Sequence, residues 1–177
     1  MYLRTCSKLV ILLLCILASP DLHACNIVYG ADWAFVLEPP HGWNIVCGTN
    51  ALEGTAVTLW PAASSTRDAK SLLYVSVSKK EPQPLQAFAG DEQDRFKARV
   101  PSLRVLPIEL PSSTAESSKL AFQFSPDAPA RQEYIAYIEG PTAYFILVLT
   151  STDAGELARQ RQAFFSAIKS FVPMKRE

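Results

Sequence analysis

The order of helix-like and strand-like segments constrains the topology of this chain more than any single motif. Helical periodicity occurs near the middle of the sequence and again near its end, and several strand-like segments precede each helical one. The sequence pattern therefore lacks the regular β-α-β-α alternation that builds a parallel, doubly wound sheet. We expect an α+β fold in which helices pack on a central antiparallel sheet.

The first predicted helix covers residues 84–99. Its apolar residues, such as Phe88 and Phe96, recur at steps of three and four, and Pro101 stops the helix. Gly90 lies inside this segment and costs about 1 kcal/mol relative to alanine. A break at Gly90 is therefore an alternative to one continuous helix.

A second helix is predicted to close the chain. Asp153 has the residue type of an N-cap, and Glu156 follows at N3, as in a capping box. We predict that this helix ends at Pro173, which cannot continue it. One face of the helix is lined by residues spaced three or four apart, namely Leu157, Arg161, Phe164, Ile168 and Phe171.

The first two strand-like segments, residues 32–37 and 43–47, are predicted to form a hairpin. Between them, Pro39-Pro-His-Gly42 has the composition of a turn, because proline restricts φ and glycine tolerates unusual dihedral angles. Residues 143–150 are almost wholly apolar, which is typical of a central strand covered on both faces. Further strands are predicted over residues 55–60, 72–78, 103–110, 119–125 and 131–139, and a turn over residues 111–118.

The N-terminus has the organisation of a signal peptide. Arg4 and Lys8 make its start positive, and residues 9–18 form an apolar run that is too short to span a bilayer, which needs about 20 residues. A polar stretch follows and ends in Ala24, a residue small enough for signal peptidase. We therefore predict that residues 1–24 are removed by cleavage just before Cys25.

Residues 25–177 are predicted to form one α+β domain that is periplasmic or secreted. The whole chain has 17 basic and 17 acidic residues, and the leader contains two of the basic and one of the acidic ones. The resulting net charge near −1 argues against nucleic-acid binding and against electrostatic docking to anionic lipid, which both need a basic surface. No second apolar stretch is long enough to form a transmembrane segment.

Cys25 and Cys47 are the cysteines that remain after cleavage, and they allow a single pairing. Because disulfides persist in extracytoplasmic compartments, we expect these two residues to form a disulfide. The alternative is a lipid anchor at Cys25, as in a bacterial lipoprotein. Leu22 and Ala24 resemble the lipoprotein motif, whereas His23 does not, and the disulfide is the favoured interpretation.

The segment Phe35-Val-Leu-Glu-Pro-Pro-His-Gly-Trp43 is similar to the aromatic-x-x-x-Pro-x-Gly-Trp opening of the PsbP-like superfamily. The later order also resembles that superfamily, with a helix containing Phe88 and Phe96, a hairpin around Gly140, and a final helix. The resemblance covers nearly all of the chain after the leader. It implies an α/β/α sandwich around an antiparallel sheet and a role in binding or assembly, and it carries over no catalytic residues.

The sequence contains no recognisable catalytic constellation. His41 is the one histidine after the leader, so the two-histidine zinc signature is excluded, and there is no Cys/His cluster for a structural zinc ion. No Gly-rich phosphate loop or Gly-x-Ser-x-Gly elbow occurs, and we expect no cofactor and no metal. Asp91, Glu92 and Asp94 could act as acids or bases, but Arg95 and Lys97 lie close enough to pair with them.

Large aromatic residues are the remaining candidates for a binding surface. Such residues are enriched at interface hot spots, although in a domain of this size most belong to the core. We place the most plausible partner-binding patch at His41 and Trp43, on the predicted hairpin turn. The other aromatic residues that could line a groove are Trp33, Trp60, Tyr134, Tyr137 and Tyr144.

These observations favour an exported, non-enzymatic binding or accessory protein that acts through a protein partner in the cell envelope. An inhibitor or an immunity-type protein is one form that this role could take. The alternative is a small periplasmic hydrolase that uses the carboxylates of the first helix or His41. A concave site with two convergent carboxylates would favour the hydrolase, and a flat aromatic patch would favour the binding protein.

Overall fold

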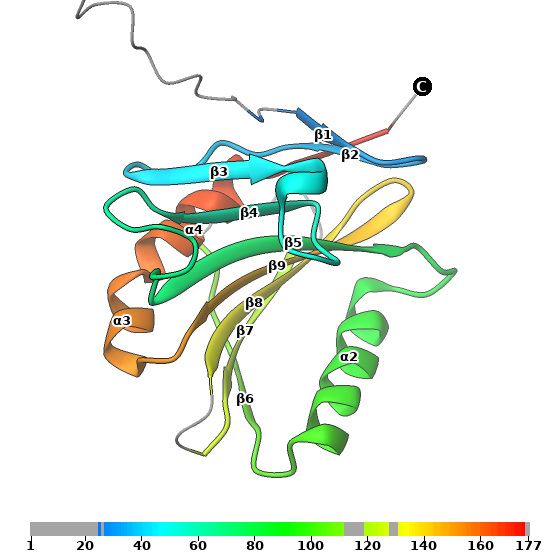
Figure 1. Ribbon diagram of the computed structural model, residues 1–177. Coiled ribbons are helices and arrows are strands. Elements are labelled where there is room, and N and C mark those ends of the chain that lie inside the picture. The colour runs from blue at the N-terminus through cyan, green and yellow to red at the C-terminus, as the bar shows by residue number, and fades with distance from the viewer. Residues whose placement is uncertain (1–24, 26, 112–118, 128–130, 176–177) are drawn as a thin grey trace, which may run out of the picture.

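A seven-stranded, fully antiparallel sheet forms the centre of the computed structural model, which describes residues 25, 27–111, 119–127 and 131–175 (Figure 1). The predicted leader with its cleavage site, and the predicted turn at residues 112–118, lie outside the described residues. The expected α+β class is confirmed. In spatial order the strands are β3 (Trp43–Cys47), β4 (Val57–Pro61), β5 (Ser71–Lys79), β9 (Ala143–Ser151), β8 (Gln132–Glu139), β7 (Lys119–Ser125) and β6 (Arg104–Pro107).

Both faces of this sheet are buried over its central strands, so β8 and β9 carry apolar residues almost throughout. On one face, Tyr137 and Tyr144 contact helix α2 (Leu85–Arg99), which continues through Gly90 without a break. On the opposite face, the alternate residues pack against α3 (Ala154–Arg159) and α4 (Arg161–Ser170). This arrangement is the expected α/β/α sandwich.

The predicted N-terminal hairpin is wrong. Strand β2 (Ala34–Val36) does not pair with β3 but with β1 (Ile27–Tyr29) and β10 (Val172–Met174), in a separate three-stranded sheet. The turn itself is present, because the Trp43 N–H donates to the Pro40 carbonyl at 3.0 Å and Gly42 has a φ of +76°.

Burial of apolar side chains explains why β2 leaves the large sheet. Phe35 and Leu37 are completely buried in the same cluster as the last helix. The Phe35 ring stacks on Phe171 at 4.7 Å between ring centroids, which holds the small sheet against the end of α4. Gly140 leaves room for the ring of Phe145, which also contacts Phe35. A β-carbon at Gly140 would lie 2.5 Å from the Phe145 ring.

The closing helix begins as predicted but is divided. Asp153 is the N-cap of α3, and its Oδ1 accepts from the Glu156 N–H at 2.8 Å. The reciprocal half of the capping box is absent, because the Glu156 carboxylate instead accepts from Arg159 and Gln160. Gln160 separates α3 from α4 with a φ of −87° and a ψ of 2°.

Helix α4 ends at Ser170, with Phe171 as its C-cap, so the helix stops before Pro173 as predicted. Lys119 on β7 donates its ammonium to the carbonyl oxygens of Ile168 (2.9 Å) and Phe171 (3.3 Å), which satisfies acceptors at the end of the helix. Burial lowers the pKa of the Lys119 ammonium. Pro173 lies in β10, where it faces Phe35 of β2.

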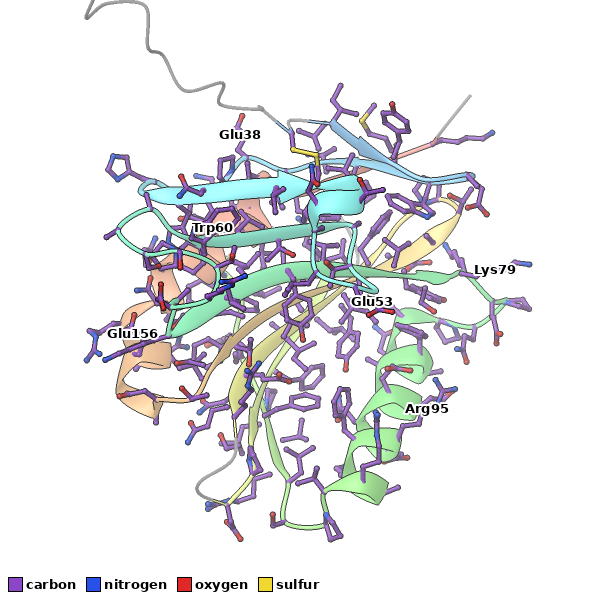
Figure 2. The ribbon with its side chains drawn as sticks, viewed as in Figure 1. Glu38, Glu53, Trp60, Lys79, Arg95 and Glu156 are labelled. Atoms are coloured by element: carbon purple, nitrogen blue, oxygen red, sulfur yellow. A yellow bond between two sulfur atoms is a disulfide. The ribbon has the colours of Figure 1, made fainter. Side chains whose placement is uncertain are left out.

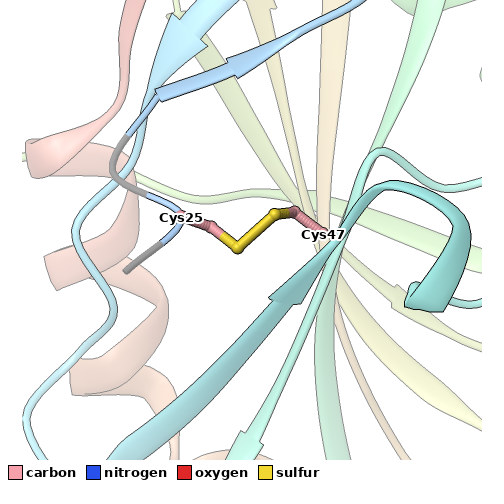
Figure 3. Close-up of a disulfide and its surroundings, with 2 residues drawn as sticks. All are labelled: Cys25 and Cys47. Atoms are coloured by element: carbon pink, nitrogen blue, oxygen red, sulfur yellow. A yellow bond between two sulfur atoms is a disulfide. The ribbon is translucent and has the colours of Figure 1, made fainter. Parts of the chain in front are cut away.

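A disulfide joins Cys25 to Cys47, as Figure 3 shows, and confirms the predicted pairing. The two α-carbons are 6.3 Å apart, and the bridge links Cys25, two residues before β1, to the end of β3. It thereby connects the small sheet to an edge strand of the large one. A thioether-linked lipid at Cys25 would need the same sulfur atom, so the structure favours the disulfide.

Candidate functional site

The two residues of the predicted partner-binding patch lie in different environments. The His41 side chain is exposed in the turn, whereas Trp43 is half-buried and packs against the larger core cluster. Replacing Trp43 would therefore disturb the core as well as the surface. A role for these two residues in binding a partner stays a prediction, and His41 is the residue at which it can be tested cleanly.

The carboxylates of α2 pair with bases on their own helix. Glu92 Oε1 lies 2.6 Å from Arg95 Nη1, and Asp94 Oδ1 lies 3.7 Å from Lys97 Nζ. Among the residues that the structure describes, there is no group of three or more His, Cys, Asp or Glu side chains that could hold a metal ion. Two of the three carboxylates on which the hydrolase alternative rests are thus engaged in ion pairs along their own helix.

Trp60 is the large aromatic residue whose position the structure singles out. Tyr134, Tyr137 and Tyr144 are buried, and Trp33 and Trp43 pack against the core. Trp60 is half-buried on β4 and, within the described part of the chain, belongs to neither hydrophobic cluster. Trp60 is labelled in Figure 2.

Trp60 lies on the half of the sheet that α2 leaves open. Helix α2 packs over β7 and β8, and Figure 1 shows it standing away from β3, β4 and β5. Strand register and alternation place four half-buried apolar residues of β3, β4 and β5 on that side, and we refer to them as the open face. They are Val46, Trp60, Leu72 and Tyr74.

The loop after β3 borders the open face. The Leu52 N–H donates to the Thr58 hydroxyl at 3.0 Å, which buries Thr58 beneath the loop. At the other end of the face, Leu72 lines a hollow together with Lys70, Arg131 and Thr150. The hollow has a volume of about 40 Å³, much smaller than the roughly 300–1,000 Å³ of a small-molecule site. The site thus combines an aromatic surface with two basic side chains at its end.

Glu133 is a carboxylate at this end of the site, on β8 directly opposite Thr150 of β9. Burial raises the pKa of the Glu133 carboxyl, while the Thr150 hydroxyl and the Arg131 guanidinium partly offset that rise. Burial, with the Glu133 carboxylate as a second cause, raises the pKa of Tyr74 to about 12. Perturbed groups of this kind gather at functional sites as well as in structural networks.

Sequence reasoning missed both Glu133 and the open face. Glu133 alternates in phase with Ile135 and Tyr137, which face α2, so its position on the buried side of β8 was detectable from the pattern. The exposure of Trp60 was not detectable, because it depends on where α2 crosses the sheet. Chemically, the site places the Glu133 carboxylate beside the Thr150 hydroxyl and the Arg131 guanidinium.

The raised pKa of Glu133 predicts a pH-dependent effect on stability. Because the folded state favours the protonated carboxyl, ionised Glu133 destabilises the protein at pH 7, and this penalty disappears as the pH falls below the ordinary value of 4.5. We expect Glu133→Gln to raise the melting temperature at pH 7 but not at pH 4. Thermal unfolding at the two pH values, with the exposed Glu109→Gln as control, tests this. A variant that is less stable at pH 7 would contradict it.

Comparison with known proteins identifies likenesses of fold. A scan against protein-family profiles matched none, and a search of curated proteins found no similar sequence. Among solved structures, LpqN of Mycobacterium tuberculosis, described as involved in cell envelope biogenesis, is 13% identical, with 79% of this chain and 83% of LpqN covered and a TM-score of 0.53.

Two further structures are similar over most of the chain. CyanoP, the PsbP protein of the cyanobacterium Synechocystis sp. PCC 6803, is 16% identical, with 80% of this chain and 86% of CyanoP covered and a TM-score of 0.48. PA94, a protein of unknown function from Pseudomonas aeruginosa, is 14% identical, with coverage of 80% and 99% and a TM-score of 0.45.

The TM-score with LpqN shows a likeness of fold, in keeping with the antiparallel sheet between helical layers. An identity of 13% says nothing about activity. Over the described residues, no helix is both long enough and apolar enough to span a bilayer.

Proposed function

We propose that this chain is an exported, non-enzymatic binding or accessory protein that docks a protein partner in the cell envelope on its open face. The observation that carries this proposal is the position of Trp60, half-buried but outside both core clusters, on the same sheet surface as Tyr74. Arg131 lies at the end of this surface. Tryptophan, tyrosine and arginine are the residue types most enriched at protein-interface hot spots.

The shape of the site supports a protein partner over a small ligand. The open face is part of a sheet surface, and the hollow beside Leu72 has room for little more than a water molecule. A partner that covers Trp60 and Tyr74 could reach Arg131 and Lys70 with an acidic group, because both basic side chains are exposed. The surface therefore suits a partner with an apolar centre and an acidic rim.

The location in the envelope rests on three independent supports. The leader-like N-terminus predicts export, and the Cys25–Cys47 disulfide suits an oxidising compartment. LpqN, which shares the fold, is described as involved in cell envelope biogenesis. An inhibitory or immunity-type role would be one form of such binding.

Substitution of Trp60 tests the proposal. The oxidised, processed protein is used to capture partners from envelope extracts, and the captured partner is then titrated against variants. We expect Trp60→Ala to weaken binding by about thirtyfold, which corresponds to a hot-spot loss of about 2 kcal/mol. His41→Ala, in the exposed turn, tests the competing surface, and under this proposal it should bind like the wild type.

The outcomes separate the two candidate surfaces. Loss of binding in His41→Ala alone would overturn the open face and favour the turn. Unchanged binding in both variants would overturn a protein-binding role for either surface. Melting temperatures of the two variants verify that lost binding does not result from unfolding.

A further inference from the structure

The small sheet presents a second, more strongly exposed apolar surface, on the side that faces away from the core. Ile27 of β1 and Val172 of β10 both pair with Val36 of β2. Tyr29 and Met174 both pair with Ala34, so these four side chains lie on the same, outward face of the small sheet. In the described part of the chain they are four of the six large hydrophobic residues that are exposed. Their exposed fractions are 57% for Ile27, 69% for Tyr29, 52% for Val172 and 38% for Met174. We refer to these four residues as the outer face.

Packing inside the protein does not require these side chains to be apolar. The intervening residues of the three strands, Val28, Phe35 and Pro173, point inward, and Val28 and Phe35 belong to the larger core cluster. Isolated exposed hydrophobic residues are ordinary, whereas four that gather on one face form a candidate contact surface for a protein or a membrane. In Figure 1, β1 and β2 of the small sheet lie at the top of the view, above β3.

The size of the outer face argues against a stable interface between two copies of the chain. Three strands spaced about 4.8 Å apart, each with three residues that rise about 3.3 Å, cover on the order of 140 Å². A stable protein interface buries about 800 Å² on each partner. A bilayer surface needs no such continuous area, because each apolar side chain can enter it separately.

The surroundings of the outer face also suit a membrane. The face begins two residues after Cys25, where the predicted leader with its apolar run at residues 9–18 joins the domain. Until the leader is cleaved, residues 19–26 can span at most about 28 Å when extended, so this face meets the bilayer during export. Exposed Lys175 follows Met174 directly, and Arg176 comes next in the sequence.

We propose that the outer face rests on the surface of a lipid bilayer. Ile27, Val172 and Met174 enter the boundary between headgroups and acyl chains, and Tyr29 lies at headgroup depth, where tyrosine is enriched. Apolar insertion is the main contribution because the protein is nearly neutral, and Lys175 adds attraction to anionic headgroups. This contact is independent of the partner-binding role of the open face.

Vesicle flotation of the exported, processed and oxidised protein tests the proposal. We expect the wild type to float with phosphatidylcholine vesicles and more tightly with vesicles that contain phosphatidylglycerol. The Ile27→Ser/Val172→Ser variant should bind both at least tenfold more weakly, since burial of one aliphatic side chain is worth about tenfold. Leu106→Ser is the matched control, because Leu106 is 56% exposed on β6 of the other sheet.

Several results would overturn the proposal. The first is failure of the wild type to float with either kind of vesicle. The second is an equal loss of vesicle binding in the Leu106→Ser and Ile27→Ser/Val172→Ser variants. A dimer seen by light scattering that disappears in Ile27→Ser/Val172→Ser, without flotation of the wild type, would assign the face to a second copy instead. The Trp60→Ala variant should float with vesicles like the wild type. Failure of the membrane proposal can therefore be distinguished from failure of the proposed binding at the open face.

Discussion

Replacing Phe35 by alanine is expected to lower the free energy of unfolding by about 4 kcal/mol, as for other fully buried phenylalanines. The Phe35 side chain has no exposed surface. Its ring stacks on Phe171 at 4.7 Å and meets the Phe145 ring edge-on at 5.4 Å. The substitution thus removes the contact that attaches the small sheet to both α4 and β9.

Chemical denaturation and thermal unfolding measure this effect, and we expect the melting temperature to fall by roughly 10 °C. Val36→Ala is the matched control, because Val36 is half-buried on the opposite side of the same strand. It should cost less than about 1 kcal/mol. Equal effects of the two substitutions would show that Phe35 does not anchor the small sheet.

Hydrogen exchange gives a local readout of the same anchor. If Phe35 holds the small sheet in place, Phe35→Ala should speed amide exchange in β1 and β10 more than in β8 and β9. A uniform increase over all strands would indicate that the small sheet and the large sheet unfold as one cooperative unit.

The second large effect is expected from removal of the disulfide. Replacing Cys25 and Cys47 by serine releases a loop with a sequence separation of 22 residues, and the chain-entropy model assigns about 3 kcal/mol to its closure. At 2–4 °C per kcal/mol, the melting temperature should fall by roughly 10 °C. Calorimetry of the oxidised protein and of the double variant measures the difference.

Reduction of the wild type provides the control for this prediction. The reduced wild type should melt at nearly the temperature of the Cys25→Ser/Cys47→Ser variant, and reductant should leave the variant unchanged. The intact mass of the protein, purified without reductant, checks the bond directly. A mass that corresponds to two free thiols, or to an added lipid, would contradict the disulfide. The bridge also fixes the chain just before β1, so the double variant is expected to bind vesicles more weakly through its outer face.

The candidate sites show which functional features local sequence reveals. His41 and Trp43 attracted notice because they occupy a turn of characteristic composition, yet Trp43 packs against the core. Trp60 had no local mark that distinguished it from the other aromatic residues. Its exposure follows from the width of the sheet, because one helix of 15 residues covers only part of a seven-stranded surface.

Local periodicity and composition by themselves determined the α+β class, the first helix, the start of the second and most of the central strands. Elimination of the leader cysteines left one pairing, Cys25 with Cys47, which the structure contains. The helices and strands depend on residues that are close in sequence, and two cysteines allow only one disulfide. The sequence was therefore sufficient to predict these features.

Only the tertiary structure decided which segment covers which apolar surface. β2 left its expected partner, β3, because Phe35 and Leu37 are buried against the end of α4, and the segment after α4 joined β2 as strand β10. The alternation of residues in a strand indicates which side of that strand is apolar. Which strands pair with it depends on long-range packing and on the loops that connect the strands. For the same physical reason, the open face and the outer face could be recognised only once all strands were in place.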